Sequence, residues 1–160
     1  MDNLAKRPIS VYPHVERFLA EYSPLICACC KDTRIFPSVA IAQAALESEW
    51  GQKAGATLFG VKGTGPAGSV TTMTKEEIKG KVVDLPDQFR AYPTREAAVR
   101  DYLKVLTTLP RYKRALRAKS PARQILEIWR GGYCTDSKYV YQIIDVIDDF
   151  DLVYFDGERA

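Results

Sequence analysis

The spacing of apolar residues at the start of the chain predicts helices that pack against a core. An apolar stripe with a helical period begins after Pro13, which fits the first turn of a helix, and it runs to about Tyr22. Pro24 is expected to interrupt this helix, because proline removes a backbone hydrogen bond from a helix interior. A second short helix is then predicted through Cys27 and Cys30.

The next segment is predicted to form a helix that is apolar on nearly all sides. Pro37 and Ser38 open it, and Gly51 helps to close it. Two polar residues four positions apart, Gln43 and Glu47, lie one turn above the other on a single narrow stripe. A helix with so little polar surface is normally buried. The carboxylate of Glu47 is therefore paired, exposed at the edge of a cleft, or retained for chemistry.

Residues 69–92 differ in character from the rest and predict a small sheet. The run before them, residues 60–68, is rich in glycine and is expected to be a loop. Threonine and valine then become frequent, and Lys79-Gly80 has the composition of a turn. We expect three short strands at Val70–Met73, Lys81–Leu85 and Gln88–Tyr92.

A helical pattern returns after the predicted sheet and continues towards the end of the chain. Thr94 is a good N-cap for the first of these helices, and Ser120-Pro121 opens the second. Two glycines at 131–132 end that helix, and Asp136 is expected to cap a last one. Helices, a β insertion and further helices in this order predict an α+β fold in two lobes.

Size and composition are those of an ordinary globular protein. The chain has 160 residues, which suit one domain over residues 1–160 with a real core. Its net charge is only +3, so charge alone favours no particular partner, and we expect no nucleic acid. Seven basic residues without an acidic one lie between Lys104 and Arg123. We interpret this run as a solvated face, with an anion-facing surface as the alternative.

The cysteines are expected to be free thiols. Cys27, Cys29 and Cys30 lie close together, and Cys134 is far along the chain. Their spacing lacks the pattern of zinc ligands, and the single histidine, His14, is far upstream. We therefore expect neither a metal nor a cofactor.

The N-terminal residues do not resemble an export signal. Lys6 and Arg7 could mimic the start of one, but residues 8–17 hold charge, a histidine and two prolines in place of an apolar core. The apolar run from Leu25 to Cys30 is too short to span a bilayer. We expect the chain to be made in the cytoplasm and not to insert into a membrane.

The predicted layout places Glu47 near the end of a buried helix, just before the glycine-rich loop and the sheet. A carboxylate on the sheet can then face it across a cleft between the lobes. The candidates are Glu76, Glu77, Asp84 and Asp87. Two such carboxylates, one in apolar surroundings and one wetter, are what glycoside hydrolysis requires. A core salt bridge or a solvated rim would give the same spacing.

Four ordered segments match the motifs of one known protein family. IAQAALESEWGQKAGATLFGVKG (41–63) follows Q-A-x-L-E-[ST]-x-W-G and then L-F-G-[IV]-K-G. TKEEIKGK (74–81) follows a T-x-E-x-x-x-G-K hairpin, and FRAYPTREAAVRDY (89–102) continues the match. GGYCTDSKYVYQI (131–143) follows G-Y-A-T-D-P-x-Y. Over roughly residues 37–146 the chain thus resembles glycoside hydrolase family 73, the glucosaminidase family of bacterial cell-wall hydrolases.

The resemblance implies catalytic roles for three residues. It makes Glu47 the general acid, and it aligns Glu76 with the hairpin carboxylate by its spacing from the motif's threonine and glycine. A register slip of one residue would give that role to Glu77, since adjacent strand residues point to opposite faces. Tyr133 aligns with the functional tyrosine of the fourth motif; without the resemblance it would be interpreted as a core aromatic next to Trp129.

The same motifs imply contacts with the substrate. These are expected from Gln43, Phe59, Gly60, Lys62 and Tyr139. The chain also departs from the family's pattern. Glu49 stands where glycine is frequent, Cys134 where alanine is usual, and Ser137 where proline is usual. Neither of the last two departures removes a catalytic group.

The fold that the resemblance implies is lysozyme-like. A mainly α-helical lobe and a small β-hairpin lobe, at about residues 69–92, would flank a substrate cleft. The implied substrate is the peptidoglycan glycan strand, cut after N-acetylglucosamine by a monomeric endo-β-N-acetylglucosaminidase. The alternatives are a muramidase or lytic transglycosylase, which cut the other glycosidic bond, and a non-catalytic glycan-binding assembly module.

The expected setting follows from features that the sequence lacks. We find no wall-binding repeat, membrane anchor or signal peptide, which favours a small phage or prophage endolysin. Such an enzyme would be made in the bacterial cytoplasm and would act in the periplasm or cell wall after release. A delivered effector or an assembly-linked hydrolase is the alternative.

Overall fold

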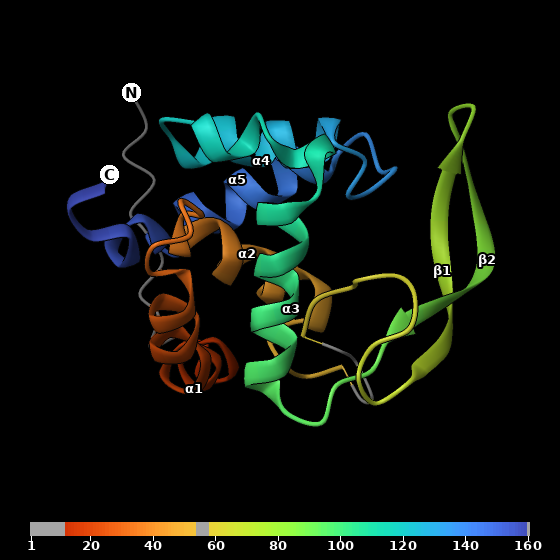
Figure 1. Cartoon of the computed structure of the whole chain (residues 1–160), viewed down its shortest axis with the longest axis horizontal. Coiled ribbons are helices and arrows are strands. Elements are labelled where there is room, and N and C mark those ends of the chain that lie inside the picture. Colours follow the sequence, from red (N-terminus) through yellow and green to blue (C-terminus); the bar gives the residue numbers. More distant parts are fainter. Residues whose placement is uncertain (1–11, 54–57, 160) are drawn as a thin grey trace.

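A body of helices carries one long β-hairpin that projects from its side (Figure 1). The computed structural model describes residues 12–53 and 58–159. Residues 6–11 of the segment used to judge an export signal, and residues 54–57 of the first family motif, lie outside the described residues. This arrangement confirms the predicted α+β fold with a helical lobe and a hairpin lobe.

The first helix, α1 (Pro13–Cys30), is continuous, so the predicted interruption at Pro24 is wrong. Pro24 lies on the exposed side of the helix, and so does Ala20, whose carbonyl loses its usual partner. Water can therefore satisfy that carbonyl. The opposite face is buried along the whole helix, from Val15 to Cys30, and this burial outweighs the local cost of proline.

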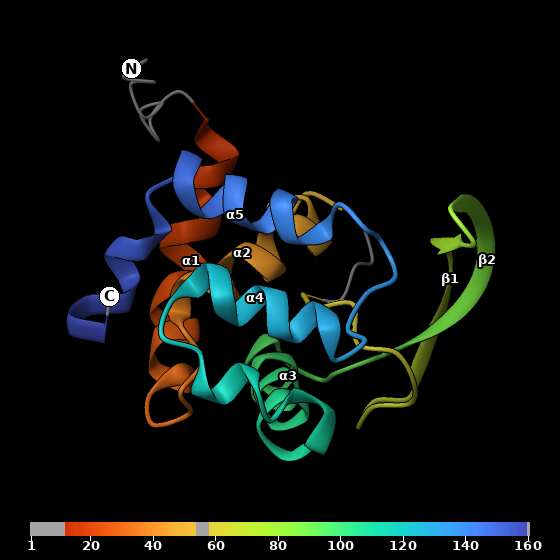
Figure 2. The same cartoon turned by 90° about the horizontal axis from the view of Figure 1, so that it is seen from above.

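The second helix, α2 (Pro37–Ser48), runs through the centre of the helical body (Figures 1 and 2). Its first turn is held by Asp156 near the end of the chain, whose carboxylate accepts hydrogen bonds from Ser38 N (2.7 Å) and Oγ (2.6 Å). The helix ends at Ser48 because Glu49 and Trp50 adopt left-handed conformations, with φ of 50° and 57°. It therefore ends before Gly51, which we had expected to close it.

The sheet has two ten-residue strands, β1 (Ser69–Ile78) and β2 (Lys81–Arg90), in place of the three short ones predicted. The turn residues Lys79 and Gly80 both have positive φ, as a tight hairpin requires. Pro86 is tolerated within β2. Hydrogen-bonded and non-hydrogen-bonded residue pairs alternate along the two strands, beginning with the hydrogen-bonded pair next to the turn. The Met73–Pro86 pair is a non-hydrogen-bonded one, so the proline nitrogen faces away from β1 and no ladder bond is lost.

Three further helices complete the body: α3 (Arg95–Thr108), α4 (Pro121–Arg130) and α5 (Tyr139–Asp149). The predicted N-caps are confirmed, since the side chains of Thr94 and Ser120 accept hydrogen bonds from Ala97 N and Arg123 N. Asp136 does not cap α5 directly. Its carboxylate accepts from Lys138 N in the turn that leads into the helix. Short 3-10 segments lie at Pro110–Tyr112, Ala115–Arg117 and Leu152–Arg159.

Two properties of the described residues bear on partners. None of their helices is both long and apolar enough to cross a membrane. Within the same ranges, no cluster of three or more His, Cys, Asp or Glu side chains could hold a metal ion. The thiols of Cys27, Cys29 and Cys134 are free.

Candidate active site

Glu47 lies in the last turn of α2, at the edge of the helical body. The residues before it on the helix are almost all fully buried, which fixes the position of its backbone. Burial raises the pKa of the Glu47 carboxyl above its usual value, and the charge of Lys53 offsets this only in part. The side chain therefore keeps its proton at a higher pH than an exposed glutamate does.

Gln43, one turn before Glu47, is fully buried and satisfied by two tyrosines. Its side-chain nitrogen donates to Tyr139 Oη at 2.9 Å, and its side-chain oxygen accepts a hydrogen bond from the Tyr102 hydroxyl. Tyr102 in turn stacks on the ring of Phe59, with centroids 3.9 Å apart. This network ties α2 to α3, α5 and the loop that follows α2, so it fixes the helix under Glu47.

Three of the residues expected to contact the substrate are buried in this structure. The side chains of Gln43, Phe59 and Tyr139 are at most 2% exposed. They support the floor of the site and present no side-chain surface to a substrate. The polar stripe of Gln43 and Glu47 is real, but its first member faces the core.

Gly60 lies against the Glu47 carboxylate. A Cβ atom at Gly60 would be 2.8 Å from Glu47 Oε2 and 3.2 Å from its Cδ. After it, the segment around Lys62 pairs with the root of β2, through a bridge to Phe89 and a hydrogen bond from Arg90 N to Val61 O (2.8 Å). The loop thus connects the Glu47 side of the site to the hairpin.

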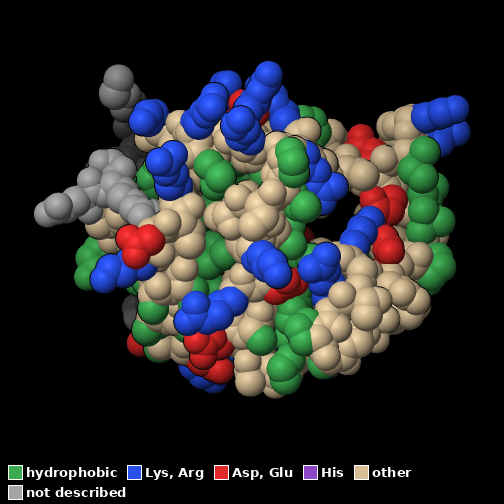
Figure 3. All heavy atoms as spheres, in the orientation of Figure 1, with side chains coloured by type: hydrophobic (Ala, Val, Ile, Leu, Met, Phe, Trp, Pro, Cys, Tyr) green, Lys and Arg blue, Asp and Glu red, His purple; other side chains and the backbone are tan. Residues whose placement is uncertain are grey.

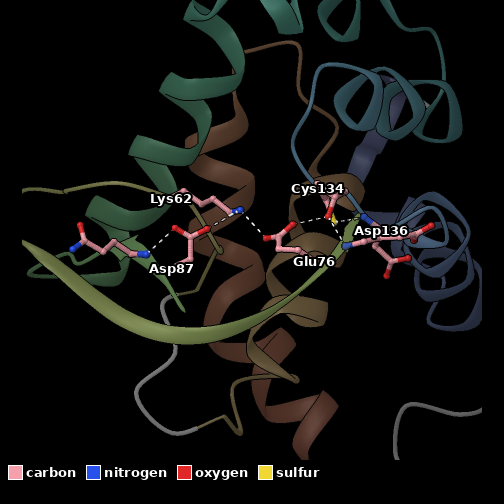
Figure 4. A network of polar contacts seen from close by, with 8 residues as sticks. Lys62, Glu76, Asp87, Cys134 and Asp136 are labelled. Atoms are coloured by element: carbon pink, nitrogen blue, oxygen red, sulfur yellow. Dashed lines mark hydrogen bonds and ion pairs between the residues drawn. The ribbon is translucent and has the colours of Figure 1, made fainter. Parts of the chain in front are cut away.

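Lys62 holds two carboxylates of the hairpin (Figure 4). Its Nζ lies 2.7 Å from Glu76 Oε1 and 2.8 Å from Asp87 Oδ2. The register places both acids on one face of the sheet, because Glu76 pairs with Val83 and Asp87 with Thr72. Lys62 is therefore an electrostatic partner of the hairpin carboxylates, a role that the sequence did not reveal.

The carboxyl group of Glu76 stays ionised. Hydrogen bonds from Lys62 and Thr135 hold its pKa below the usual value, although partial burial acts in the opposite direction. Thr135 Oγ1 donates to Glu76 Oε2 at 2.6 Å, so both oxygens of this carboxylate are engaged. Its side chain is 14% exposed. Glu76 is thus a well-positioned anion near the end of the hairpin.

Glu77 points to the other face of β1 and makes different contacts. Its Oε2 accepts hydrogen bonds from Ser137 N and Ser137 Oγ, both at 3.0 Å. These bonds lower its pKa, the one from the Ser137 backbone most strongly. Of the other sheet candidates, Asp84 pairs with Lys75, and Asp87 shares Lys62 with Glu76. Of the four candidates, Glu76 and Asp87 thus share Lys62, whereas Glu77 contacts Ser137 in the segment between α4 and α5.

Tyr133 lies in the segment between α4 and α5, close to Glu47. Its ring packs edge-on to Tyr102 (6.3 Å) and roughly parallel to Tyr139 (6.1 Å). Its hydroxyl is buried, and it has no hydrogen-bond partner among the described residues. Burial raises its pKa well above the usual value, and the charge of Glu47 contributes to the shift. A protonated hydroxyl is therefore available beside Glu47.

Cys134 connects the two carboxylates electrostatically. Burial is the main cause that raises its pKa to about 11, and the charges of both Glu47 and Glu76 contribute. Its Sγ accepts a hydrogen bond from Asp136 N at 3.4 Å (Figure 4). The segment that carries Tyr133 and Cys134 therefore lies near both acids. The fourth sequence motif marked this segment, but it did not single out Thr135 or Ser137 as contacts of the hairpin.

These groups provide what acid-assisted cleavage of an acetal needs. Burial lets Glu47 keep its proton to a higher pH than an exposed glutamate does, whereas the pKa of Glu76 is lowered because its carboxylate is paired. Environments that push the pKa values of two carboxyls apart assign the acid and the anionic role. A space-filling view shows an opening between the hairpin and the body, with acidic side chains on its hairpin side (Figure 3).

Comparison with known proteins gives one family and several relatives. The profile of the Glucosaminidase family, described as mannosyl-glycoprotein endo-β-N-acetylglucosaminidase, matches residues 23–152. The "Probable N-acetylmuramidase" of Lactococcus lactis subsp. cremoris is 36% identical over 137 residues, which are 79% of this chain and 31% of that protein. The "Exo-glucosaminidase LytG" of Bacillus subtilis is 33% identical over 131 residues, or 76% of this chain and 46% of that protein.

A solved structure resembles the whole arrangement. The catalytic domain of the autolysin Auto from Listeria monocytogenes superimposes with a TM-score of 0.73 and 33% identity, covering 89% of this chain and 88% of that domain. This chain spans less than half the length of the two relatives above. Of the Auto catalytic domain, in contrast, 88% is covered.

Proposed function

Because the chain belongs to the glucosaminidase family of glycoside hydrolases, we propose that it hydrolyses the glycan strand of peptidoglycan after N-acetylglucosamine, as an endo-β-N-acetylglucosaminidase. Glu47 protonates the leaving oxygen, and Glu76 is the second carboxylate. The observation that carries the proposal is the opposite shift of their pKa values, raised for Glu47 and lowered for Glu76. The names of the relatives, a muramidase and a glucosaminidase, support a glycan substrate.

The distribution of roles follows from the local environments. Glu47 sits on a helix whose position is fixed by the core, as a proton donor must be to meet one oxygen atom. Glu76 sits on the projecting hairpin, and it can stabilise positive charge on the sugar, attack it, or activate water. Its position on the hairpin lets the gap between the acids adjust when the substrate binds.

Tyr133 completes the proposed site. Its buried hydroxyl, without a partner among the described residues, can donate to a group of the substrate or hold a water molecule next to Glu47. Gly60 provides the space that the Glu47 carboxylate itself occupies, because a Cβ atom there would lie 2.8 Å from Oε2. Lys62 acts on the substrate only indirectly, because its ammonium group is occupied by Glu76 and Asp87.

A second candidate is cleavage of the other glycosidic bond, which the name of the Lactococcus relative favours. Analysis of the new reducing ends separates the two. Purified peptidoglycan is digested, reduced with borohydride and examined by mass spectrometry. Reduced N-acetylglucosamine at the new ends supports our proposal. Reduced N-acetylmuramic acid indicates a muramidase, and anhydromuramic acid a lytic transglycosylase.

The control for this experiment is the Glu47→Gln variant. It keeps the size of the side chain and can still form hydrogen bonds, but it has no proton to give. No new ends of either kind are expected from it. The absence of any new ends with the unmodified protein would instead favour a glycan-binding module.

A further inference from the structure

Four hydrogen bonds tie the hairpin to the segment between α4 and α5. The Glu77 amide donates to Thr135 Oγ1 at 3.3 Å, and the same hydroxyl donates to Glu76 Oε2 at 2.6 Å. Ser137 donates twice to Glu77 Oε2, from its amide and from its hydroxyl, at 3.0 Å each. We call these four residues (Glu76, Glu77, Thr135 and Ser137) the clasp.

The clasp lies at the end of the hairpin that is distant from its root. Glu77 is two residues from the turn, in a non-hydrogen-bonded pair with Val82, so its amide points away from β2 and towards Thr135. The root of the hairpin is held by separate contacts. Gly63 N donates a hydrogen bond to Gln88 O (2.9 Å), and Arg90 forms an ion pair with Asp101 (2.9 Å). The hairpin is therefore attached to the body at both ends.

Attachment at both ends turns the space between the lobes into a ring. The space-filling view shows this opening as a hole bordered by the hairpin on one side and the helical body on the other (Figure 3). A polymer laid sideways into the space must pass through the clasp. A polymer that enters by its end needs no bond to break.

Ser137 supplies two of the four hydrogen bonds of the clasp. The resemblance described above leads one to expect proline at this position, and proline has neither an amide hydrogen nor a hydroxyl. Both bonds from Ser137 to Glu77 are therefore ones that the usual residue cannot make. The bonds are exposed to solvent and can open and reform through local fluctuations.

We propose that Thr135 and Ser137 are positioning residues that determine how a glycan strand reaches the site. With the clasp closed, a strand enters by its end. An internal stretch of a long strand enters only when the clasp opens. This inference rests on the proposed function, and it adds that cleavage inside long strands is limited by opening of the clasp.

The test compares long, uncross-linked glycan strands with short oligosaccharides that contain the same bond. The variants Ser137→Ala and Ser137→Pro remove one and two donors, and Thr71→Ala is the matched control on an exposed hairpin position. We expect kcat/KM on long strands, divided by that on short ones, to rise several-fold in Ser137→Pro and less in Ser137→Ala. Early products from long strands should shift from short terminal fragments to longer internal ones.

An unchanged ratio and product pattern in both Ser137 variants would overturn the proposal. If Ser137→Pro fails to fold, the proposal is tested by the Ser137→Ala variant and by hydrogen exchange in the unmodified protein. Hydrogen exchange should show the amides of Glu77 and Ser137 protected, and both more protected than exposed amides elsewhere on the hairpin. Rapid exchange at both positions also contradicts a closed clasp.

Failure of the proposed function gives a different result. If the protein cuts the other glycosidic bond, the new reducing ends change, and the comparison of long with short strands still tests the clasp. If it is a glycan-binding module, the unmodified protein cleaves neither long nor short strands. The proposal about strand entry is then tested by the rate at which glycan strands bind to the Glu47→Gln variant, which does not turn them over. Faster association of long strands when Ser137→Pro is added supports the clasp, and equal rates overturn it.

Discussion

The carboxylate of Glu47 leaves no room for a side chain at Gly60. A Cβ atom there would lie 2.8 Å from Oε2, closer than non-bonded carbon and oxygen atoms normally approach. Gly60 has no positive φ, so the position needs glycine for space and not for its backbone conformation. A loop residue without a functional group thereby determines where the proposed proton donor stands.

Gly60→Ala should therefore reduce activity without removing any chemical group. The new methyl group displaces the Glu47 carboxylate, and a misplacement of about 1 Å can cost on the order of 10²-fold in rate. We expect kcat to fall by about 10- to 100-fold while the protein stays folded. Turnover of a short glycan fragment, with circular dichroism as the control for folding, measures this. Activity equal to that of the unmodified protein would show that Glu47 has more freedom than the structure indicates.

Glu47→Gln should abolish proton donation and stabilise the fold near neutral pH. Loss of a general acid costs roughly 10²- to 10⁴-fold in rate. The folded-state pKa of Glu47 is raised, so its contribution to stability is complete at low pH and is lost as the pH rises through that pKa. The variant should therefore melt at a higher temperature than the unmodified protein at pH 7, with a smaller difference at pH 4. Near-normal lysis by the folded variant would contradict the assignment.

Much of the site could be predicted because its backbone is set by local signals. The Gln43–Glu47 stripe follows from helical spacing, and Lys79-Gly80 predicted the turn that brings Glu76 to its place. Burial of the helix that carries this stripe was predicted as well. Residue spacing does not show whether a polar side chain faces the core or the cleft. Gln43 faces the core, where it forms hydrogen bonds with two buried tyrosines.

The errors have a common physical cause, which is that tertiary contacts override local rules. Pro24 does not break α1, because both halves of the helix bury the same face and the lost bond lies in solvent. Pro86 does not end a strand, because its nitrogen faces outward from the hairpin. The clasp and the pairing of Lys62 join segments far apart in the chain, so no local pattern predicts them.

Parallel variants of the two neighbouring glutamates test the hairpin register. Glu76→Gln should lower kcat by about 10²-fold or more, because the anion held by Lys62 is lost. Glu77→Gln removes charge from the opposite face and should leave turnover of a short fragment within a few-fold of normal. If Glu77→Gln lowers kcat more than Glu76→Gln does, Glu77 and not Glu76 is the second carboxylate.

Lys62→Met should shift only the acidic limb of the pH profile. Lys62 is the main cause that lowers the pKa of Glu76, so removing the cation raises that pKa. Activity then begins to fall at a higher pH when the solution is acidified. The basic limb, which follows the raised pKa of Glu47, should stay in place. The profile of kcat/KM on a neutral fragment measures both limbs, and Lys75→Met, a cation paired with Asp84 on the other face, is the control. Equal shifts of both limbs would contradict the assignment.

The basic stretch from Lys104 to Arg123 supplies the last prediction, because its charges lie away from the proposed carboxylates. Arg114, Arg117 and Lys119 are exposed, and none of them has an ion-pair partner within the described ranges. Basic side chains gather along the edge of the molecule near α4 (Figure 3). Stem peptides of peptidoglycan carry carboxylates, so such a face should speed encounter with the polymer.

Replacing Arg114, Arg117 and Lys119 with Glu should therefore slow lysis at low salt through slower association. Above about 0.3 M salt, where the Debye length is well under 10 Å, most of the difference should disappear. Turnover of a short uncharged fragment should barely change, because the proposed catalytic carboxylates are untouched. The double variant Arg17→Glu/Lys31→Glu, which reverses exposed cations on α1 and at its C-cap, is the control for charge reversal elsewhere on the surface. Normal lysis by the triple variant at low salt would mean that the stretch is only a solvated surface, because a polymer attracted by those charges must respond when their sign is reversed.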